Sequence, residues 1–171
     1  MGVMQFFLDF LLDSVQTHHL SGRLATFGRQ DVYTDEETLE NVAKRVGFPL
    51  RALTLAERGR INREFPPAPF SPSPDARLNK RINDQIFFRR LGFSSLCSID
   101  HSDYEGATTV YDMNTLGLAE KVGRFDTVLD IGTMEHVFHV PNFLDNLVNI
   151  LEVGGQLLQI NPMNNTKRMR L

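Results

Sequence analysis

The second half of the chain alternates between apolar segments typical of β-strands and segments of loop or helix. This alternation constrains the fold more than any other feature. A helix is predicted from about Pro141 to Leu151, before a turn at Gly154-Gly155. Strands joined through a helical crossover form a parallel sheet whose faces are covered by helices. We therefore predict an α/β fold with a mainly parallel sheet and flanking helices. Its expected strands are RLATFG (23–28), SLCSID (95–100), TTVYD (108–112), FDTVLDI (125–131) and QLLQI (156–160).

The first half of the chain contains several predicted helices. Thr34 and Glu37 have the spacing of a capping box, which opens a helix that runs to about Arg45 and ends at Gly47. Further helices are expected at 53–63 and 78–91. Between them, FPPAPFSPSPD (65–75) holds five of the eight prolines of the chain. Proline lacks the amide donor and fixes φ, so this segment is predicted to be an extended loop, either a linker or a flap over a pocket.

The chain begins with an apolar run from Met1 to Leu12. No Lys or Arg precedes this run and Asp9 interrupts it, so it lacks the charge pattern of a signal peptide and the length of a membrane span. We expect residues 1–20 to form an amphipathic helix packed on the domain or on a partner, with Phe6, Phe7, Phe10 and Leu11 on one side. An α/β domain at 21–165 and a basic tail at 166–171 complete the predicted organisation.

Composition narrows the class of protein. Hydrophobic residues make up 42% and charged residues 23% of the chain, as in an ordinary globular domain. The formal net charge of -3 argues against a broad nucleic-acid-binding face. The single cysteine, Cys97, excludes an internal disulfide and fits a cytoplasmic protein. We interpret one cluster of basic residues as the solvated face of a helix. The cluster comprises Arg77, Lys80, Arg81, Arg89 and Arg90.

Acids and glycines collect where the predicted strands end. Asp100 and Asp112 each end an apolar strand, and Gly28 ends the first one. In parallel sheets, ligands bind beyond the carboxyl ends of the strands, near the point where the strand order reverses. Asp100 there either accepts hydrogen bonds from ribose hydroxyls or caps a turn, and Asp112 either accepts from an adenine amino group or forms an Asx turn with Asn114. A full G-x-G-x-x-G loop is absent after Gly28, which argues against a dinucleotide.

A second candidate segment follows the strand at 125–131. Glu135 and His136 could act as a general base or orient a substrate, or they could simply cap and hydrogen-bond the start of a helix. His18, His19 and His101 lack metal-ligand spacing with other candidates, so we predict no metal site.

These segments resemble class I S-adenosylmethionine-dependent methyltransferases. The similarity covers roughly 22–33 and 78–165. FDTVLDIGTMEHV resembles the family's post-strand-four motif, LEVGGQLLQINP resembles its glycine turn into strand five, and GRLATFGRQD resembles a degenerate form of its first motif. The resemblance implies a Rossmann-like sheet. Because the chain ends soon after the fifth strand, we expect it to lack the last strands of that fold.

The resemblance also implies roles for particular residues. Gly28 would lie at the methionine moiety of S-adenosyl-L-methionine, Asp100 at the ribose and Asp112 at the adenine. Asp130, Gly132 and Glu135 would line the cofactor or acceptor pocket. We therefore expect a methyltransferase with an unidentified small-molecule or macromolecular acceptor. The alternatives are a catalytically inactive, methyltransferase-like module that binds cofactor or protein, and a nucleotide-binding oxidoreductase. An exposed sheet edge at 156–160 would favour a homodimer.

Overall fold

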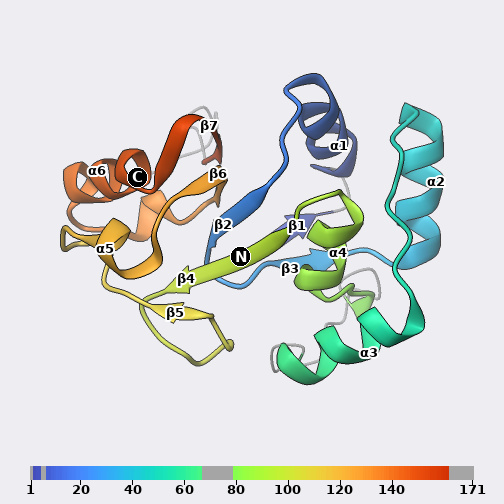
Figure 1. Cartoon of the computed structure of the whole chain (residues 1–171), viewed down its shortest axis with the longest axis horizontal. Helices are drawn as coiled ribbons and strands as arrows, with labels where there is room; N and C mark the ends of the chain where they lie inside the picture. The colour runs from blue at the N-terminus through green and yellow to red at the C-terminus, as the bar shows by residue number, and fades with distance from the viewer. Residues whose placement is uncertain (1, 5–6, 67–78, 162–171) are drawn as a thin grey trace, which may run out of the picture.

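A five-stranded sheet forms the centre of the protein. The computed structural model describes residues 2–4, 7–66 and 79–161. All five strands are parallel and lie in the order β5-β4-β2-β6-β7 (Figure 1). Numbered by their appearance within this sheet, they run third, second, first, fourth, fifth, the Rossmann order. The predicted α/β fold with a Rossmann-like sheet is confirmed. The strands are β2 (Arg23–Phe27), β4 (Ser95–Asp100), β5 (Thr109–Val110), β6 (Phe125–Ile131) and β7 (Leu151–Ile160).

Helices cover both faces of this sheet. Leu24 of β2 belongs to a core shared with α1, α2 and α4, whereas its neighbour Ala25 belongs to a second core shared with α5 and α6. Successive residues of a strand point to opposite faces, which explains this division. Figure 1 shows α5 and α6 on one side and α1 to α4 on the other. The helices are α1 (Leu8–Thr17), α2 (Glu36–Val46), α3 (Leu55–Glu64), α4 (Asp84–Arg90), α5 (Leu118–Val122) and α6 (Val140–Asn149).

The N-terminal segment differs from the single helix predicted for residues 1–20. Residues Gly2–Met4 form strand β1, which pairs in parallel with β3 (Asp31–Tyr33) as a small second sheet. Val3 lies opposite Val32 and both are fully buried, so pairing and burial override helix formation here. The helix itself begins at Leu8, and Phe10, predicted on its apolar side, is half exposed. Its buried apolar residues are Leu8, Leu11, Leu12 and Val15.

Two helices begin later than predicted. The cap of α2 is Asp35 rather than Thr34, because the Asp35 carboxylate accepts a hydrogen bond from the Thr38 amide at 2.8 Å. The helix predicted at 78–91 begins at Asp84, since the preceding Ile82 forms an antiparallel bridge with Val32 of β3. A bridged residue has extended backbone and therefore cannot belong to the helix. Helix α3 begins after Thr54 within the predicted range and carries a complete capping box with Glu57.

Strand β7 is one long edge strand rather than a turn followed by a strand. Its pairing with β6 passes from Phe125↔Leu151 directly to Thr127↔Gln156, so residues 152–155 form a bulge. Gly154 lies within this bulge with a φ of +82°. The glycine pair that was predicted to form a turn at 154–155 therefore forms the bulge. Of the strand predicted at 108–112, only β5 (Thr109–Val110) pairs.

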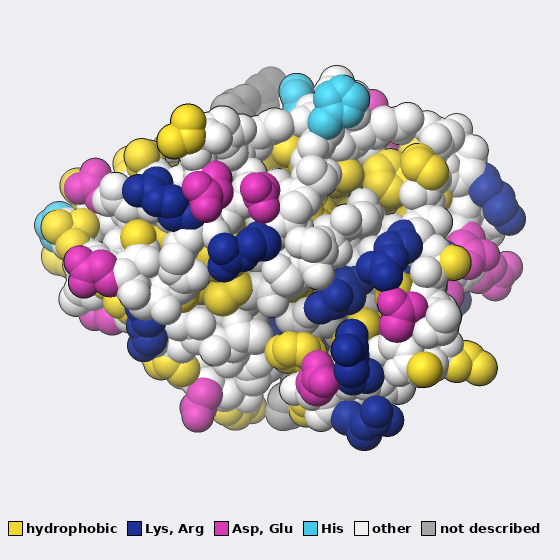
Figure 2. Space-filling model, viewed as in Figure 1, with side chains coloured by type: hydrophobic (Ala, Val, Ile, Leu, Met, Phe, Trp, Pro, Cys, Tyr) yellow, Lys and Arg dark blue, Asp and Glu magenta, His cyan; other side chains and the backbone are white. Residues whose placement is uncertain are grey.

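Three residues of the basic cluster predicted as a solvated helix face pair with acids, and of these only Arg90 lies on a helix. Arg81 pairs with Asp31, and Lys80 with Asp35. Arg90 is buried and pairs with Glu36 and Glu40 of α2. Figure 2 shows Lys and Arg side chains interspersed with Asp and Glu over this part of the surface. Arg77, residues 67–75 of the predicted proline-rich loop, and the tail at 166–171 lie outside the described residues.

Across residues 2–4, 7–66 and 79–161, each helix is too short or too polar to cross a bilayer.

Candidate functional site

A cavity of about 680 Å³ opens at the carboxyl ends of β2, β4, β5 and β6. Its volume lies in the range of small-molecule sites, and its position is the point where the strand order reverses. Of the sequence-predicted residues, Gly28, Asp100, Asp112 and His136 line it, whereas Asp130, Gly132 and Glu135 do not. The remaining lining residues are Phe27, Arg29, Ile99, His101, Glu105, Met113, Asn114, Thr133 and Val137.

Gly28 ends β2 in a left-handed conformation with a φ of +73°. Its amide donates to the carbonyl of Ile99 at 2.6 Å, which holds the end of β2 against β4. A Cβ atom at this position would lie 3.5 Å from Oδ2 of Asp100, and a side chain would be strained at this φ. The absence of a side chain leaves the backbone of Gly28 open to a ligand that contacts Asp100.

Asp100 presents its two carboxylate oxygens to different surroundings. Oδ1 lies 2.9 Å from Nδ1 of His101 and accepts from the Ser102 amide at 3.3 Å. Oδ2 is the oxygen that lies beside Gly28. One oxygen is therefore fixed by the turn after β4, and the other remains available as an acceptor. The turn-capping role considered for this acid is thus observed for Oδ1, whereas the ribose-binding role, which would fall to Oδ2, stays a prediction.

Asp112 forms the Asx turn considered from its sequence and also lines the cavity. Its Oδ1 accepts from the Asn114 amide at 2.9 Å and from Asn114 Nδ2 at 2.8 Å. These hydrogen bonds, aided by the nearby His101, hold the pKa of Asp112 below its ordinary value. Asp112 is therefore a carboxylate at neutral pH, on the β5 side of the cavity.

Asp130 is fully buried at the end of β6 and lies behind the cavity wall. Its Oδ1 accepts from the Thr133 amide at 2.8 Å, and its Oδ2 accepts from Gln159 Nε2 at 2.9 Å. Gly132 follows with a φ of +76°. These residues shape the turn after β6, and the residue that this turn presents to the cavity is Thr133.

Glu135 and His136 lie on a 3-10 turn, Met134–His136. His136 lines the cavity, but 68% of its side chain remains exposed. Its Nε2 lies 3.9 Å from Oε1 of Glu135, which is too long for a direct hydrogen bond. His136 can therefore reach a ligand in the cavity, whereas Glu135 does not line it.

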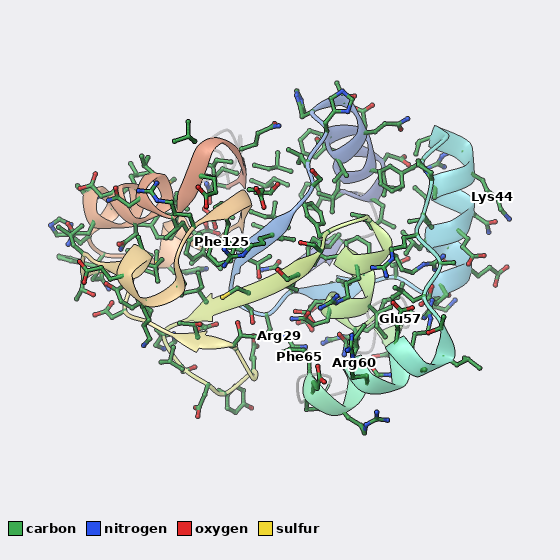
Figure 3. All side chains as sticks on the ribbon, in the orientation of Figure 1. Arg29, Lys44, Glu57, Arg60, Phe65 and Phe125 are labelled. Atoms are coloured by element: carbon green, nitrogen blue, oxygen red, sulfur yellow. The ribbon has the colours of Figure 1, made fainter. Side chains whose placement is uncertain are left out.

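Arg29 is the lining residue that sequence reasoning missed most clearly. Its guanidinium is buried and makes two parallel contacts with Asp84 at the start of α4, at 2.8 Å from Nε and 2.7 Å from Nη2. Its Nη1 donates to the carbonyl of Gly106 at 3.2 Å. Figure 3 shows Arg29 beside the loop between β4 and β5. The polar run that follows β2 marked a loop, but the burial of Arg29 depends on Asp84, which is distant in sequence.

The large cavity carries excess negative charge. Asp100, Glu105 and Asp112 line it, and its one lining Arg or Lys, Arg29, is already paired with Asp84. A concave surface lined by one sign of charge attracts ligands of the opposite sign. The cavity thus favours a cationic group over a polyanion.

In the described part of the chain, His, Cys, Asp and Glu side chains form no group of three that could hold a metal ion. Compared with known protein families, curated proteins and solved structures, the chain matches none.

Proposed function

We propose that this protein binds S-adenosyl-L-methionine and transfers its methyl group to an acceptor that remains to be identified. The observation that carries the proposal is the acidic cavity at the switch point, in which Asp100 faces Gly28. A carboxylate at the end of the second strand is placed to accept hydrogen bonds from ribose hydroxyls. The excess negative charge suits a sulfonium and an ammonium group.

The course of the chain after β2 argues against a dinucleotide. Gly28 is followed by Arg29, Gln30 and strand β3, and the next helix, α2, begins only at Glu36. Pyrophosphate binding in Rossmann domains uses a helix that begins directly after the glycine turn, with its N-terminal amides on the phosphates. The segment after Gly28 lacks that helix. S-adenosylmethionine has no phosphate and does not require one.

When bound, S-adenosylmethionine supplies an activated methyl group. The protein's part is to hold the acceptor in line with that group, which converts a bimolecular step into a unimolecular one. His136 is the lining side chain best placed to take the acceptor's proton as the acceptor forms its new bond to carbon. Asp100 and Asp112 hold the nucleoside, and Thr133 lines the cavity at the turn after β6.

One observation favours the second candidate, a cofactor-binding module without turnover. The His136 side chain is 68% exposed, and Glu135 contributes nothing to the lining. An exposed base in contact with water is poorly positioned for proton transfer. A methylation assay over candidate acceptors distinguishes the two. We further propose a cytoplasmic location, since Cys97 is a free thiol in a chain with no second cysteine.

The first prediction tests the cofactor. S-adenosylhomocysteine at millimolar concentration should raise the melting temperature, because a ligand that binds only the native state stabilises it by mass action. NAD should leave the melting temperature unchanged. Differential scanning fluorimetry with calorimetry measures both. A shift with NAD and none with S-adenosylhomocysteine would refute the proposal.

A further inference from the structure

Three loops that border the large cavity carry large apolar side chains in contact with solvent. Each of these rim loops follows a strand of the central sheet and contributes residues to the cavity lining. They are 101–108 between β4 and β5, 111–117 between β5 and α5, and 132–139 between β6 and α6. The apolar side chains are Tyr104, Leu116 and Phe138, which are 75%, 58% and 96% exposed. Exposed apolar side chains around a cavity are typical of a binding surface.

A ligand enclosed in the cavity would not cover these side chains. None of the three belongs to the cavity lining, although Tyr104 and Phe138 are next in sequence to the lining residues Glu105 and Val137. A partner that is larger than the cavity can cover them and still reach the lining. The rim loops therefore fit a macromolecule better than a small molecule.

Hydrogen bonds hold the rim loops in place. The His139 amide donates to Asn114 Oδ1 at 2.8 Å, which joins the loop of Phe138 to the loop of Leu116. Arg29 donates to a carbonyl of the third rim loop, between β4 and β5, at 3.2 Å. A surface that is ordered in advance loses less conformational entropy when it binds a partner.

The rim loops are also acidic. They contain four carboxylates and neither Lys nor Arg, whereas the formal net charge of the whole chain is only -3. The negative charge of the protein is thus concentrated at this end of the sheet. Such a surface attracts a cationic partner and repels nucleic acid or an anionic membrane. The four acids are Asp103, Glu105, Asp112 and Glu135.

We infer that the rim loops dock a basic segment of another protein, with one of its lysine side chains entering the cavity. The carboxylates attract the segment, and Tyr104, Leu116 and Phe138 pack against its apolar side chains. The two aromatic rings also attract ammonium groups through their faces. This inference names the acceptor class of the proposed function and rests on that function only for the transfer step.

In that step, the lysine ammonium first gives one proton to His136. The nitrogen lone pair then forms a bond to the methyl carbon of S-adenosylmethionine, while the carbon–sulfur bond breaks and its electron pair stays on sulfur. The products are a methylated ammonium group and S-adenosylhomocysteine.

Docking is tested without cofactor, by fluorescence anisotropy with two labelled synthetic peptides. One contains Lys, Leu and Gly, and the other has Glu in place of every Lys. The basic peptide should bind the parent protein, and the acidic peptide should not. Phe138→Ser should weaken the basic peptide about tenfold, as for loss of one buried apolar side chain. Leu55→Ser changes an equally exposed apolar residue on α3 and should leave the affinity unchanged.

A second pair of variants tests the charge. Asp103→Asn/Glu135→Gln should weaken the basic peptide at low salt, and the effect should shrink as salt screens it. Asp13→Asn/Glu64→Gln makes the same change in net charge on α1 and α3 and serves as the matched control. Equal affinity of the rim variants and their controls would overturn the docking surface, as would absence of binding or equal binding of the two peptides. Phe138-dependent binding to phosphatidylcholine vesicles, without competition from the basic peptide, would assign the surface to a membrane instead.

The outcomes separate docking from the proposed function. Failure of S-adenosylhomocysteine to bind refutes the proposed function and leaves the peptide measurements intact. Labelled methyl transfer from S-adenosylmethionine to the bound basic peptide should occur with the parent protein. A protein that binds both the peptide and S-adenosylhomocysteine but leaves the peptide unmethylated would refute lysine as the acceptor.

Discussion

One carboxylate oxygen of Asp100 is held by hydrogen bonds and the other can accept from a ligand. Substitution of Asp100 is therefore a direct test of the ligand site. His101 and the Ser102 amide hold Oδ1, and Oδ2 faces Gly28. A carboxylate oriented in this way loses little entropy when it accepts a ligand hydroxyl. We expect Oδ2 to supply binding free energy to a ligand and Oδ1 to orient the side chain.

Asp100→Ala should weaken S-adenosylhomocysteine by about ten- to a hundredfold, since charge-assisted hydrogen bonds contribute about 1.5–3 kcal/mol. Asp112→Ala should cost less, because the Asp112 Oδ1 is already engaged by Asn114 and an adenine edge offers fewer donors. Titration calorimetry measures both variants, and circular dichroism checks their folding. A folded Asp100→Ala variant with parental affinity would exclude Asp100 from the ligand site.

His136 and Glu135 should behave differently, because only His136 lines the cavity. If His136 takes the acceptor's proton, His136→Gln should lower turnover by about a hundredfold or more and leave the affinity for S-adenosylhomocysteine nearly intact. Glu135→Gln should have a small effect on either quantity. Steady-state kinetics and calorimetry on both variants decide the matter. A parallel fall in turnover and cofactor affinity for His136→Gln would make that residue structural.

Sequence reasoning located the residues that end the strands but not those that reach the cavity from elsewhere. Gly28, Asp100 and Asp112 could be predicted because each follows an apolar strand, and parallel strands end at the same sheet edge. Arg29 and Glu105 lie in polar loops, where a buried or half-buried charge looks like any solvated one. Their positions depend on the contact between Arg29 and Gly106, which no local pattern encodes.

The buried pair of Arg29 and Asp84 links the loop after β2 to the start of α4. Asp84→Ala should lower the free energy of unfolding by about 3–5 kcal/mol, because it leaves a buried guanidinium without its counter-charge. The double variant Arg29→Met/Asp84→Leu should recover much of that loss, since neither charge then remains buried. Urea unfolding measures both. A double variant as unstable as Asp84→Ala would show that the unpaired guanidinium is not the cause of the loss.

A second link between elements joins the start of α2 to α3 and α4 through Glu36. Burial alone would raise the pKa of Glu36, but hydrogen bonds and charges from Arg58 and Arg90 outweigh it, so its pKa lies below the ordinary value. A carboxyl with a depressed pKa stabilises the fold above its unfolded pKa, and this contribution is lost as the pH falls through the folded pKa.

The parent protein should therefore lose more stability than Glu36→Gln as the pH falls below about 4.5, the ordinary value for Glu. Above pH 6 the difference in stability between the two proteins should stay constant. Melting temperatures measured across this range provide the check. Identical pH profiles for the parent and the variant would show that Glu36 contributes nothing to acid sensitivity.

The elements that could be predicted from the sequence are those whose own residues carry the full apolar pattern of a strand or helix. β2, β4 and β6 are each apolar over several residues. Each pairs with strands that are far away in the sequence, and all three form where they were predicted. β1 and β3 have three residues each and are held by pairing with each other and, for β3, by the bridge between Val32 and Ile82. Helix α4 starts at Asp84 because the bridge at Ile82 keeps the preceding backbone extended. Short pairings of this kind depend on tertiary contacts rather than on local propensity.

Strand β7 lies at one edge of the central sheet and has exposed apolar side chains. Within the described residues it pairs only with β6, Val153 is fully exposed and Leu157 is 39% exposed. An unpaired apolar edge is a template for pairing with another chain. We expect the protein to form homodimers through this edge as its concentration rises. Val153→Lys/Leu157→Lys should keep it monomeric, as measured by light scattering, whereas a concentration-independent monomer in the parent would contradict the expectation.

The central position of β2 has a consequence for how quickly the chain can fold. β2 is the first strand of the sheet along the chain, yet both of its neighbours, β4 and β6, lie much later in the sequence. The Arg23 amide, for example, donates to Asp126 across 103 residues. Contacts between residues so far apart require long loops to close, and this closure costs entropy before apolar burial offsets it. Proteins dominated by such contacts fold slowly. Refolding should therefore be limited by the meeting of β2 with β6, and during that delay the apolar strands stay exposed to other unfolded chains.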